Sequence, residues 1–466
     1  MQYLNRHDAL LIFVISLLLL SSLVHASLYN TSFTLLLGVF AGIFIISFFL
    51  ITRAINDVVI NLSFLIVILS FFNFTIAPYS KYTEESYNYI FAPILFLTIL
   101  FHITGNEYKN SLIKFNTFDK FLILTSFLFL TLSTFVFNPR EISEFEGILK
   151  YINFSVGIYI FSVVLAGFLY KNENILFNFM RIICLIGILA AIFGIMTVIY
   201  PDLKPDNEYP GTAISFFKHP NATSSMYNFS IPLLVWMIIW KKKELSLLEH
   251  KFYIIGFFVS LIALLFTFSR FGIATIFLSI LIIFYGYSRK LFVFSVIFTI
   301  LAVAFAITQF FTTKGAITIL GRLGLLETSF VMMSDNIKLL FGYGGSRTRE
   351  IFEGVKFSLG VIDLNNNPHN IILFSILMYG LLFTITSTIL IFKYYYKALM
   401  LVLKKNADNL TVLSFSLCTG IFVKNMGEDL LLFPEFFMWY LFLIFFGILL
   451  IKIMTLDYMQ TDTISK

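Results

Sequence analysis

The chain has 466 residues, of which 59% are hydrophobic and only 12% charged, and its formal net charge is +6. A soluble domain has about 25% charged residues, because its surface faces water. The composition therefore excludes a soluble enzyme, a disordered chain and a disulfide-stapled secreted domain.

Long apolar runs follow one another along the chain, and most are close to the roughly 20 residues that cross a bilayer core as a helix. We expect an all-α polytopic membrane protein, a single membrane domain over residues 1–466 with about 14 transmembrane helices. The predicted spans lie near 8–27, 31–51, 57–78, 88–104, 119–138, 149–170, 176–200, 222–240, 252–269, 271–287, 290–310, 369–392, 409–427 and 434–452.

The positive charge is explained by membrane topology rather than by nucleic acid. With both termini in the cytoplasm, most of the 32 Lys and Arg residues lie in segments on the inner side, as the positive-inside rule requires. No nucleic-acid partner is expected. The two cysteines, Cys184 and Cys418, lie in apolar runs, so neither a disulfide framework nor a metal knuckle is implied.

Two segments predicted outside are too long to be simple connections: residues 201–221, and the large loop 311–368 between the eleventh and twelfth spans. In the large loop, the apolar spacing over 317–340 predicts one helix lying at the membrane interface. The glycines within 342–345 then predict a sharp turn. Because long structured loops commonly carry function, we expect this loop to form an external cap.

Arg270 stands between two apolar runs with almost no loop around it, in the stretch Thr267–Gly272. A cation at membrane depth costs about 2.5–3.5 kcal/mol on insertion scales and commonly lines a polar cavity. A guanidinium binds phosphate through two parallel hydrogen bonds and cannot lose its charge. Anion binding is one interpretation of Arg270, and snorkelling to the outer headgroups is the other.

Further cations are predicted on the outer side. Arg322 falls on the predicted interfacial helix, where a lipid headgroup contact and a substrate contact are alternatives. Arg347 and Arg349 are interpreted as solvated loop charges, with a grip on sugar or phosphate as the alternative. Lys424, at the outer end of a span, is interpreted as pairing with an acidic residue at 428–429.

Of the six histidines, only His219 and His369 are predicted at the outer face beside long loops. Pro368 fixes its own φ and biases Asn367 away from helix, so the chain enters the next span abruptly at His369. An imidazole there is near water yet partly desolvated, which suits a general base working near neutral pH. A polar helix start with an interfacial histidine explains the same residues.

The sequence lacks the motifs of several other chemistries. It has no phosphate-binding loop of the Walker A type, no HExxH, no GxSxG and no Cys/His cluster. ATP-driven transport and zinc hydrolysis are therefore not expected, and neither a metal nor a cofactor is predicted.

Taken in order, elements of the outer side resemble the O-antigen ligase/O-antigen polymerase superfamily of bacterial surface-polysaccharide assembly. The matching elements are Gly211 to Asn221 with His219-Pro220-Asn221, Ser269-Arg270-x-Gly272, Arg322, Leu339 to Gly344, and His369-Asn370 followed by Gly380 and Thr384.

The resemblance covers residues 205–390, so that 201–392 forms the family core and the first 200 residues carry no motif. Two departures stand out. Phe383 occupies the place of the second glycine in the ligase pattern, and the arginine often found just before the glycine matched by Gly211 is missing.

The resemblance implies an integral-membrane glycosyltransferase whose donor is an oligosaccharide on undecaprenyl diphosphate and whose acceptor is a sugar hydroxyl. This donor is already activated, so no nucleotide or metal is needed. The resemblance implies that Arg270 and Arg322 bind the diphosphate, whose growing charge they stabilise, and that His369 is the catalytic base. Further candidate substrate contacts are His219, Asn221, Asn370, Arg347 and Arg349.

Within this family we favour a polymerase, which adds the glycan to another lipid-linked repeat, because of the fourteen spans, the high Phe content and the imperfect His369 motif. A ligase acting on lipid A–core and a protein O-oligosaccharyltransferase are alternatives, and a chain-length regulator is a candidate partner. A lipid-linked-oligosaccharide flippase is the rival from another class. Flippase charges line a cavity between related halves, whereas the charges singled out here gather at one face. The expected location is the bacterial inner membrane, with the active site facing the periplasm.

Overall fold

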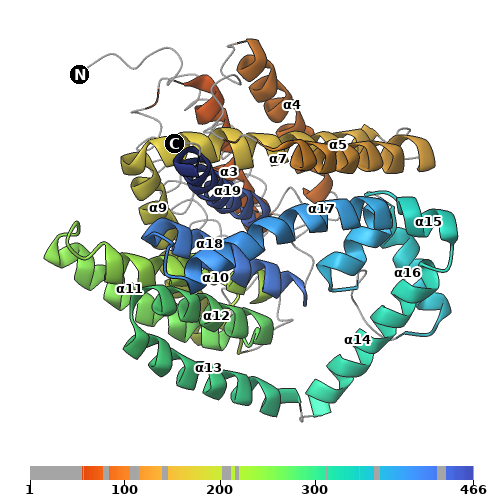
Figure 1. The fold of residues 1–466 in the computed structure, drawn as a ribbon. Helices are drawn as coiled ribbons and strands as arrows, with labels where there is room; N and C mark the ends of the chain where they lie inside the picture. The colour runs from red at the N-terminus through yellow and green to blue at the C-terminus, as the bar shows by residue number, and fades with distance from the viewer. Residues whose placement is uncertain are drawn as a thin grey trace, which may run out of the picture. The chain divides into compact units, whose positions relative to one another are not determined.

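The computed structural model of the chain describes residues 55, 57–76, 83–104, 113, 115–138, 145–201, 211–215, 220–310, 313–345, 347–361, 368–427 and 437–464. Every regular element within these residues is a helix, and none is a strand (Figure 1). The predicted all-α class is therefore confirmed for the described part of the chain. The predicted spans 8–27 and 31–51 lie outside it.

Eight of the described helical segments are long and apolar enough to cross a membrane, as expected of a membrane-embedded protein. They are Thr117–Phe137, Gly147–Lys171, Glu173–Ile199, Pro220–Trp240, Leu247–Phe266, Arg270–Tyr287, Ile371–Leu403 and Phe437–Leu456.

Four further helices coincide with predicted spans: α3 (Val58–Ile76), α4 (Thr83–Thr104), α13 (Arg289–Phe310) and α18 (Asn409–Asn425). The total of fourteen spans stays a prediction.

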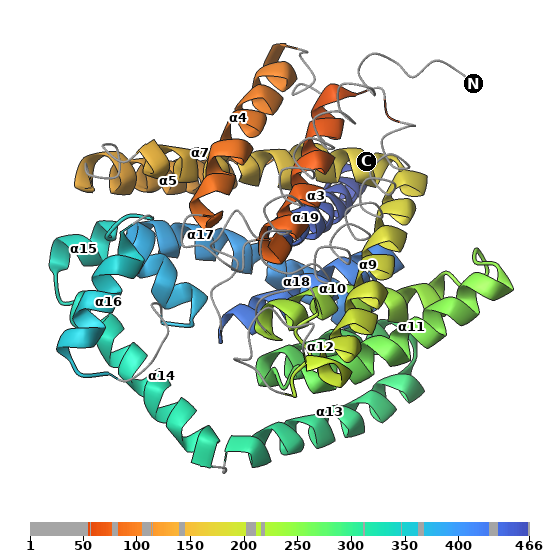
Figure 2. The ribbon, with the colours of Figure 1, turned by 180° about the vertical axis from the view of Figure 1, so that it is seen from behind.

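The chain divides into two compact units, one formed by residues 1–84 and 169–269 and the other by 85–168 and 270–466. In the first unit, α9 (Glu173–Ile199), α10 (Pro220–Trp240) and α11 (Leu247–Phe266) pack against one another (Figure 2). Small residues allow this close packing, because a side chain at Gly187 of α9 would overlap Ser230 of α10.

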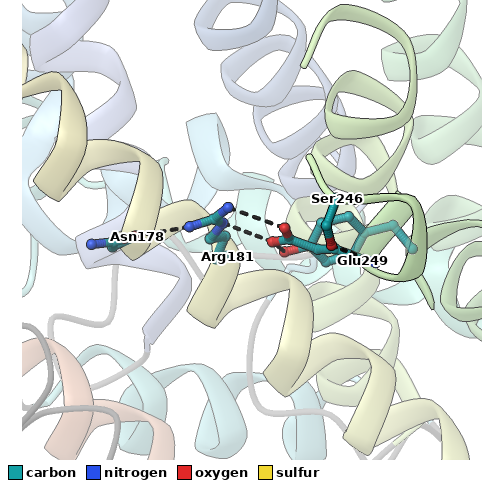
Figure 3. Close-up of polar contacts among 5 residues, drawn as sticks. Asn178, Arg181, Ser246 and Glu249 are labelled. Atoms are coloured by element: carbon teal, nitrogen blue, oxygen red, sulfur yellow. Dashed lines mark hydrogen bonds and ion pairs between the residues drawn. The ribbon is translucent and has the colours of Figure 1, made fainter. Parts of the chain in front are cut away.

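An ion pair joins α9 to the start of α11 in this unit (Figure 3). Nε of Arg181 lies 2.9 Å from Oε1 of Glu249, and Nη2 donates to Oε2 of the same carboxylate at 3.2 Å. Asn178 accepts a further bond from Nη1 at 3.3 Å. The backbone N–H of Glu249 donates to Ser246 Oγ, the N-cap of α11, at 3.2 Å. The ion pair thus ties α9 to the first turn of α11.

Several helix groups pack within the second unit. One combines α5 (Thr117–Thr131) and its continuation η2 (Leu132–Phe137) with α17 (Ile371–Leu403). Another packs α12 (Arg270–Tyr287) against α13 and α18 (Figure 1). Ser279 of α12 and Ser416 of α18 exchange hydroxyl-to-carbonyl hydrogen bonds at 3.1 and 2.8 Å, which holds these two helices in close register.

The last helix, α19 (Phe437–Ile464), packs against η3 (Ile160–Leu165), the middle part of a segment that starts with α7 (Phe145–Tyr159) and ends with α8 (Ala166–Lys171). A Cβ atom at Gly447 would overlap the carbonyl of Ser162. Backbone thus lies directly against backbone where α19 crosses η3.

The large loop folds as α14 (Thr313–Met332), α15 (Asn336–Phe341) and α16 (Thr348–Ser358). The predicted single helix over 317–340 is therefore wrong. The carboxylate of Asp335 accepts hydrogen bonds from the N–H groups of Ile337 and Lys338 at 3.0 and 3.1 Å. Asp335 therefore caps the start of a separate helix, although the apolar spacing of the sequence continues without interruption across this position.

A small core, centred on buried Leu325, Met332, Phe352 and Leu377, joins α14 and α16 to the first turns of α17. The large loop therefore has an apolar interior of its own.

Helix α17 is broken at Gly380, whose φ and ψ are 88° and 165°. The break deprives the preceding carbonyls of helical partners, and the glycine turn supplies substitutes: Tyr343 N donates to Leu377 O at 2.7 Å and Gly344 N to Met378 O at 3.0 Å. The sharp turn predicted at 342–345 is confirmed by positive φ angles of 75° at Gly342 and 97° at Gly344. The glycine turn at residues 342–345 thus packs against α17 at its break and supplies hydrogen-bond donors that the helix lacks there.

Both glycines at this crossing have no room for a side chain. A Cβ atom at Gly342 would overlap the carbonyl of Met378, and one at Gly380 would overlap the carbonyl of Leu340. Thr384, one turn after the break, donates to Gly380 O at 2.8 Å. Gly380 and Thr384, which both belong to the sequence pattern, therefore have a structural role at the break in α17.

Candidate functional site

Arg270 is the first residue of α12, and its side chain is half-buried. Helix α11 ends at Phe266, and Phe268 takes a left-handed φ of 52° between the two helices. Such a φ is uncommon for a bulky residue. Although only Ser269 and Arg270 interrupt the apolar sequence, the chain does break at the predicted boundary.

Arg322 lies on α14 and reaches the start of α12. Its guanidinium carbon is 5.1 Å from the ring centroid of Phe271, the residue after Arg270. This distance is that of a cation–π contact, in which the negative face of an aromatic ring attracts a cation. Arg322 therefore contacts the residue that follows Arg270 in the chain.

His369 lies two residues before the start of α17, in a left-handed conformation with a φ of 50°. Its side chain is half-buried, and its Nδ1 atom is fully buried. Pro368 before it is buried as well. The abrupt entry into the helix is therefore present, with the imidazole just outside the first turn.

Asn370 shapes this entry. Its Oδ1 accepts from Ile372 N and Leu373 N at 3.0 and 3.1 Å, as an N-cap does, and its Nδ2 donates to Met426 O at 3.2 Å. The amide of Asn370 is thus engaged in holding α17 to the end of α18, a structural task that the sequence analysis did not assign to it.

Gly427, next to Met426, lies against the ring of Phe271. A Cβ atom at this position would be 2.6 Å from Cε2 of the ring, so only glycine permits the approach. Phe271 therefore contacts both Arg322 and the end of α18, which in turn binds Asn370 beside His369. Through these contacts the segments that carry Arg270, Arg322 and His369 converge within one compact unit.

Phe271 and Gly427 carry no motif that marks them as candidate site residues in the sequence. Phe271 is one of 59 phenylalanines, and nothing in hydropathy separates it from the rest. The only available signal was position, because each lies within three residues of a cation that the sequence did single out.

The first block of the resemblance belongs to the other unit. His219 lies outside the described residues. Asn221 is in the first turn of α10, where its backbone carbonyl accepts from the hydroxyls of Ser224 and Ser225, both at 2.8 Å. This end of α10 is rich in buried hydroxyl groups.

Arg347 is the N-cap of α16, and Arg349 lies in the first turn of this helix. Nε of Arg347 is 3.9 Å from Oε2 of Glu350, whose side chain is 76% exposed. The Arg347 side chain itself is only 27% exposed. The solvated-charge interpretation and a grip on substrate therefore both stay predictions for Arg347.

Lys338 is a further cation of the loop that the sequence analysis did not single out. Its Nζ donates to Phe137 O at 3.1 Å and to Asn138 Oδ1 at 2.7 Å, both at the end of η2. Burial lowers the pKa of Lys338, which nearby Arg347 lowers further, whereas Asp335 raises it. Lys338 therefore attaches the loop to the end of η2.

No protein-family model matches the chain, and no curated protein matches it. Among the described residues, no group of three or more His, Cys, Asp or Glu side chains could hold a metal ion.

Proposed function

We propose that the chain is an integral-membrane glycosyltransferase of the bacterial cytoplasmic membrane. It transfers an undecaprenyl-diphosphate-linked oligosaccharide to a sugar hydroxyl of another lipid-linked repeat, on the outer face. The observation that supports the proposal is the pair of contacts made by Phe271, the residue after Arg270. Its ring contacts Arg322, and it packs against Gly427, next to the Met426 carbonyl that binds Asn370 beside His369.

The arginines match the charge that the reaction creates. When the bond between the anomeric carbon and the diphosphate oxygen breaks, the diphosphate leaves with the electron pair and gains negative charge. Fixed cations stabilise this leaving group more than the intact donor, and such differential binding lowers the barrier. Arg270 and Arg322 supply the cations, and the ring of Phe271 orients Arg322.

His369 completes the reaction by removing a proton. The acceptor oxygen bonds to the anomeric carbon as its proton passes to the imidazole. Because Nδ1 is buried, Nε2 is the nitrogen assigned to this step. The left-handed backbone conformation at His369 sets the direction in which its side chain projects from the backbone.

The purified protein with lipid-linked repeat as the sole substrate tests the proposal. A polymer ladder supports a polymerase. Product that forms only with lipid A–core indicates a ligase, and product that forms only with an acceptor protein indicates a protein O-oligosaccharyltransferase. Movement of the lipid-linked repeat across vesicle membranes without any transfer would indicate a flippase and contradict the proposal.

A further inference from the structure

The turn between α10 and α11 is rich in lysine. Residues 241–243 are three consecutive lysines, and Lys251 follows one turn into α11. Lys242, Lys243 and Lys251 are all exposed. We call residues 241–246 the lysine turn. It lies between two helices that are long and apolar enough to cross a membrane.

The two carboxylates of this segment are already paired with other cations. Oε1 of Glu244 lies 2.6 Å from Nζ of Lys241, and Glu249 is paired with Arg181 of α9 (Figure 3). No acidic side chain among the described residues pairs with the three exposed lysines. The segment 241–251 thus presents three uncompensated positive charges.

Local contacts hold the lysine turn in one conformation. The N–H of Lys241 donates to Met237 O at 3.2 Å, and that of Glu244 donates to Lys241 O at 2.9 Å. Leu245 is buried, and Ser246 caps α11. The exposed lysines therefore project from a backbone that is already ordered, which lowers the entropic cost of binding a ligand.

Helix α11 has a packed face and an exposed face. The packed face contacts α9 and α10, and a Cβ atom on Gly256 would overlap the side chain of Ile188 of α9. The exposed face carries large apolar side chains, which we call the α11 stripe: Leu248, Phe252, Ile255, Phe258 and Ile262. At about 100° per residue, the stripe spans about 120° around the helix axis, and Lys251 falls inside the same arc.

Cations at the start of an exposed apolar stripe match the two parts of a phospholipid. Leu248, the first residue of the stripe, is 82% exposed and lies three residues from Lys251. Lysines at the end of a membrane helix attract anionic headgroups, whose phosphate accepts charge-assisted hydrogen bonds. A second copy of the chain fits this face less well, because a two-fold contact would bring the same lysines together.

We propose that the lysine turn, Lys251 and the α11 stripe form a binding site for an anionic phospholipid. The three exposed lysines bind the headgroup, and the acyl chains lie along the stripe. All these residues belong to the first unit, whereas Arg270, Arg322 and His369 belong to the second. The lipid site is therefore independent of the proposed glycan transfer.

A fluorophore on the stripe reports which lipid occupies it. Ile255→Cys provides an attachment point at an exposed position one turn after Lys251, and the native Cys184 and Cys418 are buried. We measure quenching of the fluorophore in vesicles that contain phosphatidylglycerol or phosphatidylcholine with nitroxide-labelled acyl chains. Comparison of the two quenching curves gives the preference for the anionic lipid at this position.

The proposal predicts that phosphatidylglycerol is preferred about fivefold or more at this position, and that high salt weakens the preference. Adding Lys243→Gln and Lys251→Gln is expected to bring the two lipids to within about twofold of each other, since each lysine near an anionic surface contributes about fivefold in affinity. The matched control is Lys404→Gln with Lys405→Gln, two exposed lysines after α17 in the second unit. This control is expected to keep the preference.

Equal quenching by the two lipids in the protein that retains its lysines would overturn the proposal. So would a preference that survives the loss of Lys243 and Lys251, or one that the control pair removes to the same extent, since charge would then act without a local site. Absence of quenching by either lipid, together with a disulfide between two unlabelled Ile255→Cys chains, would also overturn it and would identify a second copy as the occupant.

Discussion

Phe271 connects the candidate site at the scale of single residues. Its ring contacts the guanidinium of Arg322 on α14 and packs closely against Gly427, whose lack of a side chain permits the approach. The sequence does predict the polar residues of this site, because charges stand out in an apolar chain. It cannot predict the ring that brings them together, since contacts between distant apolar residues leave no trace in hydropathy.

Replacing Phe271 by leucine keeps an apolar side chain and removes the aromatic face. The cation–π contact contributes about 0.5–2 kcal/mol, so we expect glycan transfer to fall by about twofold to thirtyfold. Phe268→Leu is the control, because Phe268 lies three residues away and is 59% exposed. Steady-state transfer rates measure both variants, and equal rates in the two would remove Phe271 from the site.

His369→Asn tests the base without disturbing the backbone. Asparagine tolerates the left-handed φ of this position better than most residues but cannot act as a base near neutral pH. We expect transfer to be lost while the melting temperature stays close to that of the wild type. Polymer of near-normal length from this variant would disprove the assignment of His369 as base.

At the level of secondary-structure elements, α17 and the glycine turn at residues 342–345 are joined by backbone hydrogen bonds and close packing. The sequence predicts the turn from its glycines, but the break at Gly380 falls inside a run of apolar residues that hydropathy treats as one continuous span. The partner of the break lies about 35 residues away along the chain, so a local pattern does not reveal it. In the loop, a single aspartate, Asp335, likewise divides the helix predicted over 317–340.

Gly380→Ala is expected to destabilise the protein by about 1–3 kcal/mol or more, because φ is 88° and the added Cβ would overlap the Leu340 carbonyl. Gly354→Ala is the matched control. Gly354 is an exposed helical glycine with no atom within 4 Å of an added Cβ, so alanine there is expected to add about 0.5–1 kcal/mol. Thermal unfolding in detergent compares the two variants. Equal melting temperatures would contradict the close packing of the glycine turn against α17 at Gly380.

At the scale of the whole molecule, the low charge of the chain remains the most informative property of its sequence. The helices occupy the predicted spans wherever the structure describes them, because an apolar run of about 20 residues has few other stable forms in a bilayer. The proposed orientation rests on the side preference of lysine and arginine.

Labelling of introduced cysteines tests this orientation directly. The native Cys184 and Cys418 are both free and buried, so background labelling in intact cells is expected to be low. A membrane-impermeant maleimide should label Glu353→Cys in the large loop and spare Lys242→Cys between α10 and α11, both of which are exposed positions. The reverse labelling pattern would indicate the opposite membrane orientation and would place the proposed site in the cytoplasm.

We propose that this protein transfers glycan from undecaprenyl diphosphate by means of its own cations and histidine. The most direct measurement is polymer formation by the purified protein from lipid-linked repeat alone, in the presence and absence of EDTA. We predict a ladder of polymer lengths that chelation leaves unchanged and that His369→Asn abolishes. Absence of transfer to a lipid-linked repeat, to lipid A–core and to an acceptor protein alike would contradict the claim.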